Sequence, residues 1–477
     1  MDFLTNVNAK IEENKAEMVS SLSTLLSIPS VASESGGIAP FGEDVQRAYD
    51  QTMNMAKDAG FRTFNADNYG GHIDYVAGPN DNGEIVGIIG HLDVVPAGND
   101  WDFEPYGGEV IDGNICGRGA TDDKGPVIAA FYAMKALKEC GYEPKRTIRM
   151  ILGLDEETNW QGMDYYLESV DKLPNYGFTP DADFPAIHGE KGILIFDIAK
   201  KFNGTSDKGL ELSSIKGGTV ANAVADYARA VLHESSGAGY DSVKDAVVLF
   251  RENKGCKINC RGIGKSLEIT VSGKAAHGAQ PEKGLNAISL MMEFLGELNF
   301  VNDDVNDFIG FYNDCIGYDI HGERIGCGFE DEPSGKLIFN VGKIELDKKS
   351  VELTINIRYP VTSNDAAVYD GMMSVLDKYA LGIVKDSHQL SIYIAKGDPL
   401  VETLVDVYRK HTGDMDTEPQ VIGGGTYARA MDNIIAFGAH FPDEPELEHQ
   451  KNELISIDNM MKLTRIYAEA IYRLAEM

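Results

Sequence analysis

Two apolar runs, each ending in a loop of acidic or histidine residues, constrain the fold of this chain most strongly. Residues 85–89 (IVGII) lead into GHLD at 90–93, and residues 147–154 (TIRMILGL) lead into DEE at 155–157. Short apolar runs of this kind are typical of buried β-strands, and open α/β sheets bind ligands at the carboxyl ends of their strands. The sequence therefore predicts an α/β protein whose functional side chains lie at one edge of a sheet.

Further acidic residues are expected near the same edge. Asp122 and Asp123 precede a segment with apolar residues at helical spacing, which begins at about residue 126. Capping of that helix explains one acid, but two adjacent acids flanked by glycines exceed what a cap requires. The three acids at 155–157 repel one another unless cations compensate them, and a solvated turn is the alternative interpretation. Asp181, in the acidic loop 179–183, and His449, in the last segment, extend the set.

The candidate metal ligands come from separate loops and are His91, Asp122, Glu157, Asp181 and His449. Histidine combined with carboxylates suits zinc, and manganese or cobalt is also acceptable. A carboxylate shared by two ions would hold them close together, as in paired-metal hydrolases, where the ions activate water and polarise a carbonyl group. A carboxylate that binds no metal must then accept the proton of the water, and Glu156 fits this role beside Glu157. For any one of these residues taken alone, an ordinary polar loop is the alternative.

Composition and charge limit the partners of this chain. It has 477 residues, 43% of them apolar, and a formal net charge of −32. The length accommodates two or three domains, and the negative charge argues against a nucleic acid or an anionic membrane as partner. No apolar run is as long as a membrane span, and the N-terminus lacks the apolar segment of a signal peptide, so we expect a cytoplasmic protein. Six scattered cysteines indicate reduced thiols. His72 and Asp74, beside a turn, are interpreted as surface residues.

The pattern of predicted elements changes in the middle of the chain. Between about residues 193 and 393, β-like segments alternate with helices predicted at 284–298 and 363–379. Earlier helices are predicted at about 9–26 and 42–59, and a later one at 398–411. We therefore expect one domain formed by both ends of the chain, residues 1–192 and 393–477, with an α+β domain of residues 193–392 inserted between them.

Eight motifs then carry a family resemblance, in order along almost the whole chain: GHLDVVPAG (90–98), GRGATDDKGP (117–126), DEETNWQGMDYYL (155–167), PDADFP (180–185), HGAQPEKGLNAI (277–288), NIRYP (356–360), GGGTYAR (423–429) and EHQKNE (448–453). With these motifs the chain resembles the cocatalytic-zinc metallopeptidases of the aminoacylase and carboxypeptidase G family, and among them the PepV-type dipeptidases. The resemblance implies an α/β catalytic domain, with a central mixed β-sheet flanked by helices, and an inserted α+β lid domain.

The resemblance also implies two divalent metal ions per chain, zinc with manganese or cobalt as alternatives. Asp122 would bridge the two ions. His91 and Asp181 would complete one site, and Glu157 and His449 would complete the other.

Further roles follow from the same motifs. Asp93 would orient His91, and Glu156 would be the general base. The remaining implied residues are His277, which would stabilise the oxyanion, and Asn222, Arg358 and Arg429, which would bind substrate. The arginine at 358 would contact the terminal carboxylate of the substrate. The Asp122–Asp123 peptide would be cis.

These features together predict a metallopeptidase that hydrolyses dipeptides with a free N-terminus, including β-alanyl-histidine types. An N-acyl or N-succinyl amino-acid deacylase of the same family is the alternative, because its metal chemistry would be identical. A lid of about 200 residues favours the dipeptidase. A catalytically silent metal or peptide binder is disfavoured, because every expected catalytic position is occupied. The only partner expected is a small peptide, and a monomer is expected in preference to a homodimer.

Overall fold

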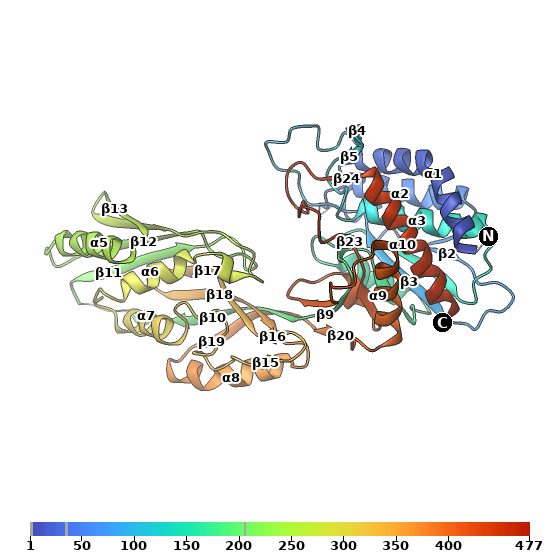
Figure 1. Cartoon of the computed structure of the whole chain (residues 1–477). Helices are drawn as coiled ribbons and strands as arrows, with labels where there is room; N and C mark the ends of the chain where they lie inside the picture. The colour runs from blue at the N-terminus through green and yellow to red at the C-terminus, as the bar shows by residue number, and fades with distance from the viewer. Residues whose placement is uncertain (1–2, 34–36, 205–206) are drawn as a thin grey trace. The chain divides into compact units, whose positions relative to one another are not determined.

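The computed structural model describes residues 3–33, 37–204 and 207–477, and it divides into two units (Figure 1). Within the described residues, the first unit contains the chain up to Gly189 together with Ile394–Gln420 and Gly425–Met477. The second unit contains Glu190–Tyr393 and the short segment Val421–Gly424. The sequence predicts this short segment as part of the domain formed by both ends of the chain.

A mixed β-sheet forms the centre of the first unit. Its strand order is β1-β2-β6-β3-β7-β22-β9, and β20 and β21 pair with β9 where the chain passes between the units. The pairs β3–β6, β3–β7 and β22–β7 are parallel, whereas β1–β2, β2–β6 and β22–β9 are antiparallel. The strands are β1 (Arg62–Asn65), β2 (Gly71–Tyr75), β3 (Ile85–His91), β6 (Thr147–Gly153), β7 (Tyr176–Thr179), β9 (Ile187–Glu190), β20 (Ile392–Tyr393), β21 (Gln420–Ile422) and β22 (Ile434–Ala436). The predicted α/β class with a mixed sheet is confirmed.

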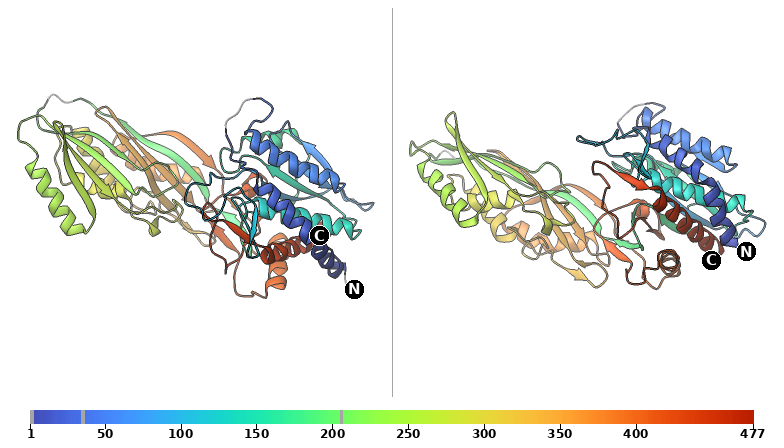
Figure 2. Two further views of the ribbon diagram at one scale, coloured as in Figure 1. Left: turned by 90° about the horizontal axis from the view of Figure 1, so that it is seen from above. Right: turned by 45° about the horizontal axis from the view of Figure 1, so that its top comes forward.

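Helices from both ends of the chain pack together on this sheet. The apolar positions of α3, among them Val127, Ala130 and Met134, are fully buried, because α3 packs against α1, α10 and β3 (Figures 1 and 2). The helices of the unit are α1 (Phe3–Leu26), α2 (Glu43–Asp58), α3 (Lys124–Glu139), α4 (Gln161–Ser169), α9 (Pro399–Thr412) and α10 (Ile457–Glu476). The first helix begins six residues before the predicted start at residue 9, because the Phe3 ring packs against Tyr142 and Tyr472.

Three parallel strands end at the edge where the candidate residues lie. His91 is the last residue of β3 and pairs with Gly153, the last residue of β6. On the other side of β3, β7 ends at Thr179, two residues before Asp181. Because neighbouring parallel strands run in the same direction, the loops that follow all three meet at one edge.

Two small sheets bring the last segment of the chain to that edge. β24 (Leu454–Ser456) pairs with β5 (Asn114–Cys116), which in turn pairs with β4 (Glu109–Ile111). β23 (Ala439–His440) pairs with β8 (Ala182–Asp183). These pairings hold the segment around His449 near the loops that carry Asp122 and Asp181.

The second unit contains an eight-stranded antiparallel sheet of order β13-β14-β12-β11-β17-β18-β10-β19 (Figure 1). Ala228, Ala230 and Leu232 alternate along β12 and are fully buried, because α6 packs on this face of the sheet. The strands are β10 (Gly192–Lys201), β11 (Leu210–Gly217), β12 (Tyr227–Glu234), β13 (Lys257–Ile263), β14 (Ser266–Ser272), β17 (Ile338–Leu346), β18 (Ser350–Tyr359) and β19 (Gly382–Gln389), with a separate pair β15 (Glu330–Asp331) and β16 (Gly335–Lys336). The helices are α5 (Asp241–Lys254), α6 (Ala287–Leu295), α7 (Asp303–Cys315), α8 (Asp365–Lys378) and the 3-10 helix η1 (Pro281–Lys283).

His72 and Asp74 are buried, at only 6% and 5% exposed, so the interpretation of them as surface residues is wrong. Two side-chain contacts explain their burial, since Arg149 donates two hydrogen bonds to Asp74 and the Tyr166 hydroxyl lies 2.9 Å from His72 Nδ1.

Among the residues described, no helix is long and apolar enough to cross a membrane.

Candidate active site

Five side chains that the sequence predicted as metal ligands gather at the sheet edge in the first unit. They form two groups, one of His91, Asp122 and Asp181 and the other of Asp122, Glu157 and His449. Within each group, one possible ligand atom from every residue lies within 4.8 Å of the others. Asp122 belongs to both groups, so one carboxylate stands between two sets of donors.

Asp122 presents one oxygen to each group. Its Oδ1 lies 3.0 Å from His91 Nε2, and its Oδ2 lies 3.0 Å from His449 Nε2. His449 Nε2 is also 3.0 Å from Glu157 Oε1, and His91 Nε2 is 3.7 Å from Asp181 Oδ2. The peptide bond after Asp122 is cis, as the resemblance implies. A carboxylate that faces two imidazoles in this way can bridge two cations.

His91 is oriented by its neighbours. Its Nδ1 lies 3.0 Å from the carbonyl oxygen of Asp93 and 3.4 Å from Asp93 Oδ1, and a proton on Nδ1 donated there leaves the Nε2 lone pair for a metal. The backbone N–H of His91 donates to Asp123 Oδ2 at 3.0 Å. Asp123 is fully buried, so this second acid of the pair holds the strand end.

Asp93 also holds the loop that carries the two glutamates. The backbone N–H groups of Glu156 and Glu157 donate to the two oxygens of Asp93, each at 3.1 Å. The indole of Trp160 donates to the carbonyl oxygen of Glu156 at 2.7 Å. Because the backbone is held at both residues, two adjacent carboxylates can take separate roles.

The acids crowd one another electrostatically. Burial raises the pKa of Glu156 well above its usual value, and the charges of Asp181, Glu157 and Asp93 raise it further. Burial and the charge of Asp181 likewise raise the pKa of Asp123. Several carboxylates packed this closely need compensating cations. Imidazole nitrogens and carboxylate oxygens are also the donors that zinc takes, so the residues present fit a pair of divalent cations.

Three further residues contact the candidate site in ways that the sequence did not indicate. Neither Asp123, in the motif GRGATDDKGP, nor Glu453, in the motif EHQKNE, is assigned a role at the site by the sequence. Tyr427, in the motif GGGTYAR, is fully buried, and its ring packs edge-on against His91 with 6.4 Å between the ring centres. Nothing in the spacing of these residues indicated their contacts, because each partner comes from a distant segment.

Three predicted residues belong to the second unit. Asn222 and His277 are exposed neighbours there, since the N–H of Gly278 donates to the carbonyl oxygen of Asn222 at 2.7 Å. A Cβ on Gly278 would lie 2.8 Å from the Asn222 backbone, so the close approach requires glycine. Arg358, near the end of β18, is 5% exposed and donates from Nε to Asn356 Oδ1 at 3.0 Å. The last substrate candidate, Arg429, lies in the first unit in the 3-10 helix η2 (Tyr427–Ala430).

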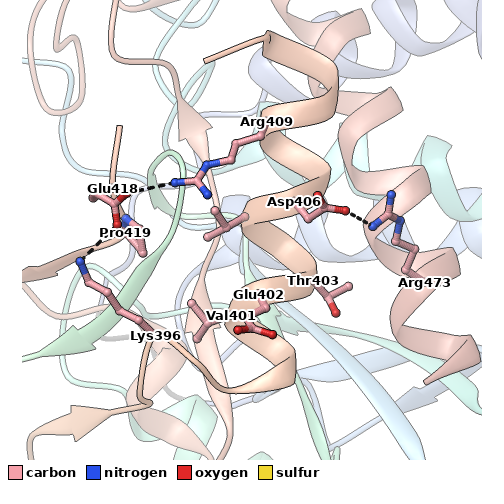
Figure 3. Close-up of a pocket in the computed structure, with 10 residues that line it drawn as sticks. Lys396, Val401, Glu402, Thr403, Asp406, Arg409, Glu418, Pro419 and Arg473 are labelled. Carbon is pink, nitrogen blue, oxygen red and sulfur yellow. Dashed lines mark hydrogen bonds and ion pairs between the residues drawn. The ribbon is translucent and has the colours of Figure 1, made fainter. Parts of the chain in front are cut away.

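A pocket of about 540 Å³ in the first unit lies away from these loops, beside α9 (Figure 3). Its cations are already paired within the protein: Arg409 lies 3.1 Å and Lys396 3.5 Å from Glu418, and Arg473 lies 2.5 Å from Asp406. We therefore do not assign substrate binding to this pocket.

Comparisons with known proteins agree on one family. The model of "Peptidase family M20/M25/M40" matches residues 87–473. A Staphylococcus epidermidis protein named "Putative dipeptidase" is 39% identical over 473 residues, which cover 98% of each chain. Proteins of Staphylococcus aureus with the same description are 37% identical over the same length.

Solved structures show the same fold at lower identity. The crystal structure of human carnosine dipeptidase 1 aligns with a TM-score of 0.59 at 17% identity and covers 100% of both chains. The aminoacylhistidine dipeptidase of Vibrio alginolyticus aligns with a TM-score of 0.56 at 15% identity and covers 96% of this chain and 95% of its own.

Proposed function

The chain belongs to peptidase family M20/M25/M40 and is a metal-dependent hydrolase of peptide bonds, and from that premise we propose that it cleaves free dipeptides with the side chains gathered around Asp122. The observation that carries the proposal is the shared carboxylate, which faces His91 on one side and His449 on the other, each at 3.0 Å. The full-length likeness to proteins described as dipeptidases supports the substrate class.

In this proposal the five gathered side chains would hold two divalent ions, zinc with manganese or cobalt as alternatives. His91 and Asp181 would serve one ion, Glu157 and His449 would serve the other, and Asp122 would serve both. When bound, such ions lower the pKa of a water molecule and polarise the carbonyl group that is attacked. Asp93 keeps the His91 ring and the two glutamates in place through the contacts described above.

Glu156 is the proposed general base. Its carboxylate accepts the proton of the attacking water and then donates it to the nitrogen of the leaving amine. Burial and the neighbouring charges of Asp181 and Glu157 raise its pKa, which makes it a stronger proton acceptor than a solvated glutamate.

His277 is the proposed oxyanion donor. The N–H of Ala279 donates to His277 Nδ1 at 3.3 Å, a contact that favours the tautomer with its proton on Nε2. From Nε2 the ring can donate to an oxygen that becomes negative in the transition state. Asn222, joined to the same loop, would contact the substrate beside it.

Arg358 is the proposed reader of the substrate's terminal carboxylate. A guanidinium group can donate two parallel hydrogen bonds to a carboxylate, which suits a substrate only two residues long. Arg429 is a further substrate contact in this proposal. The proposed substrates are dipeptides with a free N-terminus, including β-alanyl-histidine.

A hydrolysis screen tests the function directly. Zinc- or manganese-loaded protein is assayed on free dipeptides, β-alanyl-histidine and N-acetyl or N-succinyl amino acids, and bound metal is counted by elemental analysis. We expect two ions per chain and faster turnover of the free dipeptides. Faster turnover of the acylated amino acids would replace the dipeptidase by a deacylase, and one ion per chain would refute the paired-metal arrangement.

The screen has a companion measurement that does not depend on turnover. Removal of metal by a chelator should lower the melting temperature, because the clustered carboxylates lose their counterions, and added zinc should restore it. An unchanged melting temperature would contradict a metal-filled site in this cluster.

A further inference from the structure

The loop that carries Asp122 is held by a single buried side chain, that of Glu453. Glu453 has no exposed surface. Its Oε2 accepts hydrogen bonds from Arg118 Nη1 at 2.6 Å and from the N–H of Gly119 at 3.0 Å. Its Oε1 accepts from the N–H of Thr121 at 2.8 Å, from the Thr121 hydroxyl at 2.9 Å and from the N–H of Asp122 at 3.2 Å. One carboxylate thus receives five donors from residues 118–122.

The position of Glu453 in the chain explains why it can reach this loop. It directly precedes β24, which pairs with β5, and its own carbonyl oxygen accepts from the N–H of Gly117 at 3.0 Å. It also lies four residues after His449, the candidate ligand from the last segment. Glu453 therefore joins the segment that presents His449 to the loop that presents Asp122.

The backbone of Gly119 and the charge of Arg118 both suit the position of Glu453 beside this loop. Gly119 has a φ of +90°, a conformation that favours glycine, and in it the N–H of Gly119 donates to Glu453. Arg118 is only 2% exposed and forms an ion pair with Glu453. Its Cζ atom lies over the Trp101 ring, 5.2 Å from the ring centre. The cation of Arg118 and the five donated hydrogen bonds therefore offset part of the repulsion between Glu453 and Asp122.

We propose that Glu453 is a positioning residue for the paired-metal site, which fixes the Asp122 carboxylate in the place where it faces both His91 and His449. This inference rests on the proposed function, because it concerns the same metals. A carboxylate that bridges two ions must be placed for both at once, so a shift of the 118–122 loop weakens both sites. Partners that orient metal ligands typically change metal affinity by about 10- to 100-fold when they are removed.

The test is zinc affinity, measured by competition with a chromophoric chelator, in folded protein. Glu453→Gln keeps the shape of the side chain but places an amide NH₂ group where one carboxylate oxygen accepted N–H donors. We expect its zinc dissociation constant to rise by about 10- to 100-fold. Thr121→Val removes only the hydroxyl contact and should raise the constant by a smaller factor.

Glu469→Gln is the matched control. Glu469 is also buried, at 3% exposed, and it is also held by basic side chains, those of Lys410, His411 and Arg473. These partners belong to α9 and α10 and not to a ligand loop, so the control should lose stability while its zinc affinity stays within about twofold of the wild type.

The outcomes separate this inference from the proposed function. Wild-type protein that binds two zinc ions and cleaves dipeptides, together with unchanged zinc affinity in Glu453→Gln, would overturn only the positioning role. An equal loss of affinity in Glu469→Gln would overturn it too, since the effect would then be general destabilisation. If Glu453→Gln fails to fold, Thr121→Val decides, and wild-type zinc affinity in that variant refutes the inference. Failure of the wild type itself to bind two ions refutes the proposed function.

Discussion

Replacement of Arg358 by alanine should separate the reading of the substrate's carboxylate from the chemistry of peptide cleavage. Arg358 is only 5% exposed, and its Nε donates to Asn356 Oδ1 at 3.0 Å, so the side chain is both desolvated and fixed in direction. Loss of one partner from a buried, hydrogen-bonded charge pair costs about 2–5 kcal/mol. At about 1.36 kcal/mol per factor of ten, kcat/KM for a free dipeptide should fall by roughly 30- to 5,000-fold, mainly through KM.

The same substitution should matter much less for a dipeptide amide. An amidated C-terminus carries no charge, so only an ordinary hydrogen bond of about 0.5–1.5 kcal/mol is lost, which corresponds to roughly a 2- to 13-fold effect. Arg358→Lys should lie between the wild type and the alanine variant, because lysine keeps the charge but lacks the planar fork of donors.

The assay is steady-state kinetics of both variants on one dipeptide and its C-terminal amide. Arg261→Ala is a suitable control, since Arg261 belongs to the same sheet but its side chain is 75% exposed and pairs with Glu268. It should leave both rates unchanged. Equal losses on the dipeptide and the amide in Arg358→Ala would refute the reasoning, because the arginine would then not recognise the carboxylate.

Three further predictions address the base, the oxyanion donor and the pH dependence of stability. Glu156→Gln should keep zinc binding but lower kcat by roughly 10²–10⁴, and near-normal turnover would assign the base to another group. His277→Ala should lower kcat by about 10²–10³ with little change in KM, and a change confined to KM in the same kinetic assay would argue against an oxyanion donor. Burial alone would raise the pKa of Glu469, but hydrogen bonds from three basic side chains of α9 and α10 lower it from 4.5 to about 2. Its contribution to stability is therefore complete above about pH 4.5 and is lost as the pH falls through about 2, so the melting temperatures of the wild type and Glu469→Gln should differ by a constant amount above pH 4.5 and approach each other as the pH falls from about 4.5 to about 2.

Local sequence patterns were enough to predict the fold class and the residues proposed as metal ligands. Apolar runs such as residues 85–89 and 147–154 have to be buried, and the loops that follow neighbouring parallel strands have to meet at one edge. These patterns and the motifs predict His91, Asp122 and Asp181 as neighbours at that edge, where the structure places them. Helix positions were also predictable to within a few residues where apolar spacing was regular, as in α2 and α9.

The groups that hold these residues in place come from distant segments, which the fold brings together. Asp93 accepts hydrogen bonds from residues 63 and 64 positions away, Asp123 holds a residue 32 positions before it, and Glu453 holds Thr121 across 332 positions. Periodicity reports the environment of a residue along its own strand or helix, and it carries no signal for a partner in a distant segment. Burial of His72 was missed for the same reason, because Tyr166, 94 residues later, packs over it. The residues of the candidate site were therefore predictable from local sequence patterns, whereas the contacts that hold them in place join segments that meet only after the chain has folded.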